Sequence, residues 1–227
     1  MSEEQHFQSS AVVRDFIIGI SDGLTVPFAL AAGLSGAVEQ TSIIITAGLA
    51  EIAAGSIAMG LGGYLAGSTE IVHYESEERR EYEEIEKLHE MEIRETKEIF
   101  SRYGLTDDLQ EKVAREMAKR PQQWVDFMMR FELGLERPDK NRARQSALVI
   151  GFSYVLGGLI PLSAYFFTNT PRQGLTYSCV ITFCCLIIFG LVKSKLTGQP
   201  LFKGALHVTV VGALAAGAAF VLAKLIT

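Results

Sequence analysis

Apolar residues gather in five long runs along this chain of 227 residues. Each run is long enough for a helix that crosses a bilayer, which takes about 20 mostly apolar residues. We therefore expect five membrane-spanning helices, at residues 16–38, 42–68, 146–167, 175–192 and 205–226. Polar or glycine-containing stretches separate them, and the longest lies between the second and third spans. The pattern predicts an all-α membrane protein with five transmembrane helices and one large polar insert.

The insert has the helix start and stop signals of three helices. Neither glycine nor proline occurs between the end of the second span and Gly104, so this span is expected to continue unbroken into the first insert helix. A second helix is predicted to begin at Thr106 or Asp107, and a third, over residues 122–135, follows Pro121. The expected parts of the chain are a tail with spans one and two (1–70), the insert (71–141) and spans three to five (142–227).

Lys and Arg residues are distributed unevenly among the connections between spans. Most lie on one side, before span three or between spans four and five: Arg137, Lys140, Arg142, Arg144, Lys193, Lys195 and Lys203. Because basic connections stay in the cytosol, we expect the N-terminus and the insert to be cytosolic and the C-terminus to be lumenal. The tail, residues 1–10, is acidic and polar, unlike the start of a cleaved signal peptide, so the first span is expected to remain as an anchor.

The charge is concentrated in one part of the insert. Residues 70–98 contain twelve glutamates and five Lys or Arg, a balance of −7, whereas the whole chain has −5. The rest of the chain therefore has a net charge of +2, and most of its residues are apolar. A surface this acidic attracts cations and repels nucleic acid, so a nucleic-acid partner is excluded.

Many of these glutamates repeat at three- and four-residue spacing, which places them on one stripe of a helix. Like charges at this spacing repel, so the stripe needs a compensating cation. The candidate ligands are Glu81, Glu84, Glu92 and Glu95. On one straight helix the two pairs would lie about 12–16 Å apart, so that no single ion could bridge them. Several ions, completed by water or by other helices, could bind instead.

Met128 and Glu132 form an i, i+4 pair on the third insert helix and could face the acidic stripe. The alternative interpretation is a solvated acidic face, with Met128 in a small hydrophobic core. Two Glu-x-x-His patterns, at Glu70–His73 and Glu86–His89, would lie roughly 24 Å apart on one helix, which excludes a shared di-iron centre within one subunit.

The predicted spans contain acids of their own. A carboxylate such as Asp22 is costly at membrane depth unless it is paired, hydrated, protonated or bound to a metal. Glu51 lies near the middle of the second span, with Met59 two turns later and Asp15 two turns before Asp22. Two carboxylates and a thioether suit a borderline transition metal better than Ca²⁺ or Mg²⁺.

Each of these residues also has a structural interpretation. Asp15 could be an interfacial acid near a helix start, Asp22 a structural hydrogen-bond acceptor and Met59 a space-filling side chain. Tyr154 and His207 could line a path, but core packing is the favoured interpretation for both. The sequence contains no P-loop, nucleophile elbow or HExxH motif, and the chain is not expected to be an enzyme.

The segment RDFIIGISDGLTVPFALAAGLSG at residues 14–36 resembles the first span of the vacuolar iron transporter family, and the resemblance extends through EIAAGSIAMG at 51–60 and the acidic insert. The insert is similar to that of the plant and fungal type. The resemblance implies a homodimer in the vacuolar membrane that exchanges cytosolic Fe²⁺ for protons. It implies no prosthetic group, and Mn²⁺, Co²⁺ and Zn²⁺ are further candidate ions.

The resemblance also implies roles for the residues singled out above. The transport path would contain Asp22, Glu51 and Met59, with Asp15 near its entrance. The insert would collect metal on Glu81, Glu84, Glu92, Glu95, Met128 and Glu132. Fe²⁺/proton antiport is therefore the leading hypothesis. The alternatives are a metal sensor or storage protein anchored in the membrane, a ferroxidase, and a passive channel.

Overall fold

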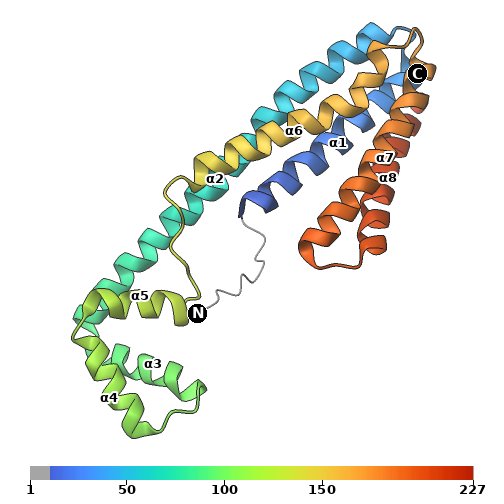
Figure 1. The fold of residues 1–227 in the computed structure, drawn as a ribbon. Coiled ribbons are helices and arrows are strands. Elements are labelled where there is room, and N and C mark those ends of the chain that lie inside the picture. Colours follow the sequence, from blue (N-terminus) through green and yellow to red (C-terminus); the bar gives the residue numbers. More distant parts are fainter. Residues whose placement is uncertain (1–10, 227) are drawn as a thin grey trace. The chain divides into compact units, whose positions relative to one another are not determined.

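The computed structural model describes residues 11–226 (Figure 1). The tail predicted for residues 1–10 lies outside the described part of the chain. Within residues 11–226 every regular element is a helix, and there are eight. Five are long and apolar enough to cross a membrane, which confirms the five predicted positions. They are α1 (Ala11–Ala37), α2 (Thr41–Lys87), α6 (Arg142–Phe166), α7 (Pro171–Thr197) and α8 (Leu201–Ile226).

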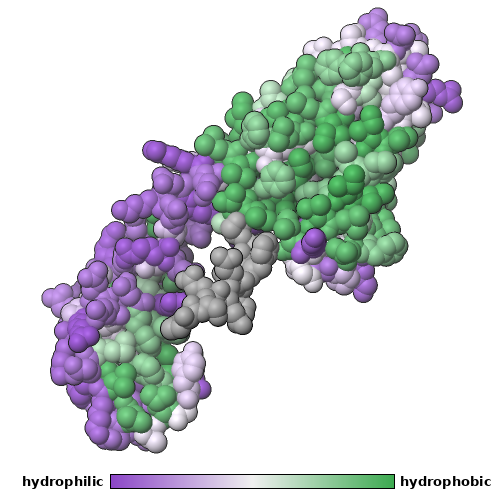
Figure 2. Space-filling view, in the orientation of Figure 1, coloured by the Kyte–Doolittle hydropathy of each residue, from purple (hydrophilic) through white to green (hydrophobic). Residues whose placement is uncertain are grey.

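The chain divides into two compact units. The first consists of residues 1–65 and 143–227, and the second is Ala66–Arg142. Figure 2 shows a broad hydrophobic surface on the first unit, with hydrophilic residues at its two ends. Large apolar side chains of this unit, such as Ile57, Leu148 and Phe202, are exposed. A soluble protein rarely exposes an apolar surface of this extent, whereas a membrane protein presents one to lipid.

Small residues let the helices of the first unit approach closely. A Cβ added at Gly23 of α1 would lie 2.3 Å from the carbonyl oxygen of Tyr154 in α6. A Cβ at Gly55 of α2 would lie 2.5 Å from the hydroxyl oxygen of the same tyrosine. Lipid supplies no hydrophobic force between helices, so such close packing is a main source of their association.

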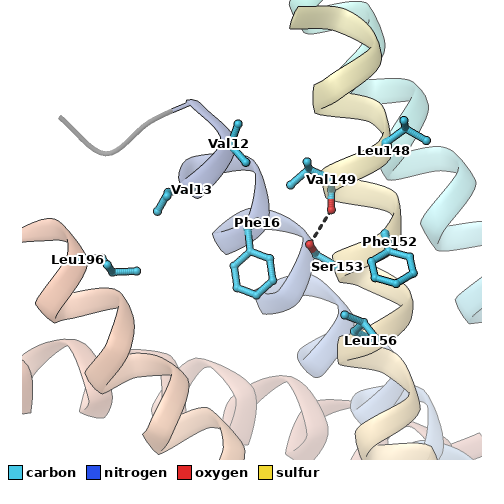
Figure 3. A pocket seen from close by; sticks show the side chains of 9 residues that line it. All are labelled: Val12, Val13, Phe16, Leu148, Val149, Phe152, Ser153, Leu156 and Leu196. Atoms are coloured by element: carbon cyan, nitrogen blue, oxygen red, sulfur yellow. Dashed lines mark hydrogen bonds between the residues drawn. The ribbon is translucent and has the colours of Figure 1, made fainter. Parts of the chain in front are cut away.

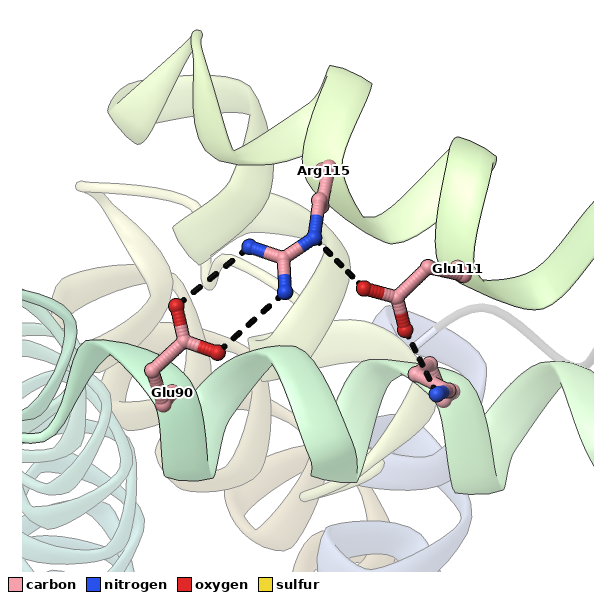
Figure 4. A network of polar contacts seen from close by, with 4 residues as sticks. Glu90, Glu111 and Arg115 are labelled. Carbon is pink, nitrogen blue, oxygen red and sulfur yellow. Dashed lines mark hydrogen bonds and ion pairs between the residues drawn. The ribbon is translucent and has the colours of Figure 1, made fainter. Parts of the chain in front are cut away.

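The second unit contains the end of α2 together with α3 (His89–Arg102), α4 (Asp107–Ala118) and α5 (Pro121–Phe131). Helices α4 and α5 begin where Thr106 and Pro121 predicted. Their apolar faces surround a core that includes Tyr74, Ile85, Ile93, Ile99, Trp124, Val125, Met128 and Met129. A chain of ion pairs links α3 to α4, in which Arg115 contacts both Glu90 and Glu111 (Figure 4).

Helix α2 continues from the second span into the insert, as predicted, but the prediction that this helix reaches Gly104 without a break is wrong. Helix α2 ends at Lys87, Leu88 has φ −126° and ψ 33°, and α3 begins at His89. No glycine or proline marks this break. Its physical reason is tertiary: Ile85 before the break and Ile93 after it are both buried in the same core, and burial of apolar side chains outweighs the small local cost of interrupting a helix.

Candidate metal sites

Three carboxylates from three segments meet in the second unit. Glu81 lies on α2, Glu92 on α3, and Glu132 directly follows α5. One oxygen from each lies within 4.8 Å of the others. The expectation that a single ion could not bridge Glu81 and Glu92 is therefore wrong, because it assumed a straight helix and the break at Leu88 turns the chain. We call these three residues the carboxylate triad.

Two members of the triad are deeply buried. Glu81 and Glu92 are each 2% exposed, and the Oε2 atom of each has no hydrogen-bond partner. The neighbouring Arg80 pairs with Glu77 and Glu84. Burying carboxylate oxygens without hydrogen-bond partners costs free energy. A divalent cation can be coordinated by several such oxygens at once.

The triad carboxyls hold protons more tightly than ordinary glutamates. Burial, followed by the charges of Glu95 and Glu81, raises the pKa of Glu92 to about 8. Burial and the charge of Glu132 raise the pKa of Glu81 to about 7. Burial also raises the pKa of Glu132. A cation that bound the triad at neutral pH would therefore displace protons from it.

The other predicted insert residues surround this triad in different ways. Glu84 and Glu95 are half-buried, and the charges of both act on Glu92. Met128 is completely buried in the core, where the hydroxyl of Thr96 lies 3.4 Å from its sulfur. A solvated acidic face does not describe Glu81 or Glu92. His89 packs its ring edge-to-face against Trp124 and is outside the triad.

In the first unit, Glu51 is held by a tyrosine. The Tyr154 hydroxyl donates to Glu51 Oε1 at 2.5 Å, and Oε2 of Glu51 is buried without a hydrogen-bond partner. Tyr154 is buried, which agrees with the core packing favoured for it, and its hydroxyl also bonds Glu51. A signal was present in the sequence, since a tyrosine hydroxyl within a membrane span requires a polar partner.

Tyr154 also brings the helices that carry the two predicted acids together. Its backbone abuts Gly23, the neighbour of Asp22, and its ring abuts Gly55, one turn after Glu51. Asp22 is close enough to act on Tyr154 electrostatically. Met59 lies about 12 Å beyond Glu51 along α2, and Asp15 lies about 10.5 Å before Asp22 along α1. The four predicted path residues are thus distributed along the spans.

An apolar pocket on the first unit is a different kind of feature (Figure 3). Its lining comes from α1, α6 and α7: Val12, Val13, Phe16, Leu148, Val149, Phe152, Ser153, Leu156 and Leu196. The Ser153 hydroxyl donates to the Val149 carbonyl. Since no carboxylate lines this pocket, it offers no site for a cation.

Comparisons with known proteins cover nearly the whole chain. The model of the VIT family matches residues 13–224. Vacuolar iron transporter 1 of Arabidopsis thaliana is 52% identical over 98% of this chain and 89% of its own length, and that of Tulipa gesneriana is 50% identical over 98% and 90%. Protein CCC1 of Saccharomyces cerevisiae is 39% identical over 95% of this chain and 69% of its own length.

The raised pKa values predict how the stability of the metal-free insert depends on pH. The folded state keeps protons that the unfolded state releases near pKa 4.5, so stability falls as pH rises from about 4.5 to about 8. Hydrogen exchange of α3 in the chelator-treated full chain, corrected for intrinsic rates, should show less protection at pH 8 than at pH 5.5. Zn²⁺ should restore protection at pH 8. Protection that rises with pH would contradict this assignment.

Replacing one triad carboxylate should weaken metal binding. The change Glu92→Gln keeps the side chain's shape but removes its charge, so we expect an affinity for Zn²⁺ at pH 7.5 lower by about tenfold or more. Calorimetric titration of the full chain measures this. Glu98→Gln, on an exposed position of the same helix, is the matched control. Equal affinities for the two variants would exclude Glu92 as a ligand.

Proposed function

Since this chain belongs to the VIT family, with vacuolar iron transporters as relatives over almost its full length, we propose that it carries Fe²⁺ from the cytosol into the vacuole in exchange for protons. Iron as the substrate and the vacuolar membrane as the location follow from those relatives. Exchange with protons is the part of the proposal that depends on the chemistry of the spans.

The state of Glu51 carries this part of the proposal. Its hydrogen-bond partner is the uncharged Tyr154 hydroxyl, and its other oxygen is buried without one. A carboxylate that forms an ion pair with Lys or Arg could not easily exchange a proton for a metal ion. One that lacks such a partner is stabilised by binding either a proton or a metal ion. Asp22, on the helix that abuts Tyr154, supplies the second carboxylate.

This chemistry gives an exchange cycle. In the neutral cytosol the ionised carboxylates of Asp22 and Glu51 bind Fe²⁺. On the acidic lumenal side protons compete for the same oxygens and release the ion, and the neutral acids return. Asp15 would attract ions near the entrance, and the thioether of Met59 would favour transition metals over Mg²⁺ and Ca²⁺.

The distribution of Lys and Arg favours a cytosolic insert, and such an insert would collect metal before transport. The carboxylate triad provides the central site, and Glu84, Glu95 and Met128 contribute charge and a soft donor nearby. A homodimer belongs to the same proposal. One face of α2 exposes Ala50, Ala54, Ala58 and Gly62 at four-residue spacing, and such a stripe permits the close approach of a second helix.

One alternative also draws on a specific observation. A metal sensor or storage protein would use the carboxylate triad in the same way, and it would bind Fe²⁺ without releasing it inside sealed vesicles. A sensor has no use for acids in the spans, so Glu51 and Asp22 favour transport. A ferroxidase would consume oxygen when Fe²⁺ is added, and a passive channel would ignore the pH gradient.

Removing the charge of Asp22 should impair exchange. In proteoliposomes with an acidic interior, Asp22→Asn is expected to lower the initial rate of Fe²⁺ uptake at least about tenfold, because an amide cannot alternate between proton and metal. Asp107→Asn, on an exposed position of α4, is the control. If Asp22→Asn transports as fast as the parent chain, Asp22 is not an exchanging group.

Loss of the Tyr154 hydroxyl should alter Fe²⁺ transport while the fold persists. Tyr154→Phe frees Glu51 Oε1, and we expect KM for Fe²⁺ to change at least about threefold. Tyr165→Phe on the same helix is the matched control, because it removes an equally buried hydroxyl that contacts Ser35 instead of a carboxylate. Equal effects of the two changes would mean that Tyr154 acts only in packing.

A further inference from the structure

Side chains of α3 and of α5 with its end meet inside the insert. Glu92 and Thr96 lie one turn apart on α3, and Met128 and Glu132 lie one turn apart along and just beyond α5. Oxygens of Glu92 and Glu132 approach within 4.8 Å, and the Thr96 hydroxyl lies 3.4 Å from the Met128 sulfur. Thr96 and Met128 are therefore each one helical turn from a member of the carboxylate triad.

The Thr96 hydroxyl is the centre of a buried polar cluster. It accepts a hydrogen bond from Nε1 of Trp124 at 2.7 Å. Its own single hydrogen has two acceptors within reach, the Glu92 carbonyl oxygen at 2.8 Å and the Met128 sulfur at 3.4 Å. Thr96, Trp124 and Met128 are all completely buried. Water therefore cannot replace any of these partners.

One hydrogen shared between two unequal acceptors leaves the sulfur replaceable. A thioether is a weak acceptor, and it loses little when the hydroxyl bonds elsewhere. The hydroxyl itself stays satisfied by the Glu92 carbonyl when the sulfur turns away. A metal ion can thus take the Met128 sulfur without leaving a buried polar atom unpartnered, a cost that otherwise opposes binding.

We propose that Thr96 is a positioning residue that sets the metal specificity of the insert, because its hydroxyl holds the Met128 thioether beside the carboxylate triad and yields it to a softer divalent cation. This inference rests on metal binding by the triad, as set out above. A thioether contributes to binding of softer ions such as Co²⁺ and contributes little to Mn²⁺, which prefers oxygen ligands.

Apolar packing alone does not account for the arrangement. Val125 and Met129 of α5 already fill the core together with Ile93 and Ile99 of α3, and an apolar core tolerates small shifts of one helix along another. The hydrogen bond from Trp124 to Thr96, and that from Thr96 to the Glu92 carbonyl or the Met128 sulfur, are directional. They fix which residues of α3 and α5 lie opposite each other.

The test compares Co²⁺ and Mn²⁺ affinities of the full chain in detergent by calorimetric titration. Thr96→Val keeps the side-chain shape and removes the hydroxyl. We expect it to weaken Co²⁺ binding about tenfold and Mn²⁺ binding less than about threefold, a size usual for outer-shell partners of metal ligands. Thr96→Ser should restore the parent affinities. Thr106→Val is the matched control, because that exposed hydroxyl makes no capping hydrogen bond.

Thr96→Val leaves the Trp124 indole nitrogen without an acceptor, so the fold is checked separately. Trp124 is the only tryptophan of the chain, and its emission reports directly on this core. The double change Thr96→Val with Trp124→Phe removes both partners and should show the same loss of Co²⁺ over Mn²⁺ selectivity if the fold is retained.

Four results would overturn the proposal. If the Co²⁺ and Mn²⁺ affinities fall equally, Thr96 contributes only to the fold. If neither affinity changes, Thr96 has no role in metal binding. Failure of Thr96→Ser to rescue would exclude the hydroxyl. If Glu92→Gln also leaves both affinities at the parent level, metal binding by the triad itself is absent, and the insert's proposed role fails together with this one.

Discussion

Carboxylate oxygens that are buried without a hydrogen-bond partner are the constraint on which the rest of this structure depends. Glu51 in the spans and Glu81 and Glu92 in the insert each have one such oxygen. Burying an ionised carboxylate in this way costs several kcal/mol, and a protein that kept it only for stability would lose little by replacing it. These residues make physical sense as groups that bind protons and metal ions in turn.

The two units solve the problem of positioning such groups by different means. In the spans, glycines remove the side chains that would separate α1 and α2 from α6, so that Tyr154 reaches both helices. In the insert, water surrounds the helices and an apolar core supplies the force that folds α3 back after Leu88. Close packing positions the first site, and hydrophobic burial positions the second.

The sequence predicts the parts of this fold that local rules determine. Apolar runs of sufficient length located the five spans, and Thr106 and Pro121 located the starts of α4 and α5. The break at Leu88 was not predictable in this way, because no local signal accompanies it and its cause is the shared burial of Ile85 and Ile93. The distance between Glu81 and Glu92 was therefore overestimated.

The nature of the donors separates the tasks of the two sites. The carboxylate triad is assembled from three segments of the insert, so an ion bound there would link those segments, and its affinity would be coupled to local folding. Glu51 and Asp22 lie on spans held together by close packing, so an ion bound between them would not be needed to hold those helices together. A site whose ion also links three segments would suit retention, and a site on closely packed spans would suit rapid exchange. This difference supports the proposal that the insert collects metal and the spans transport it.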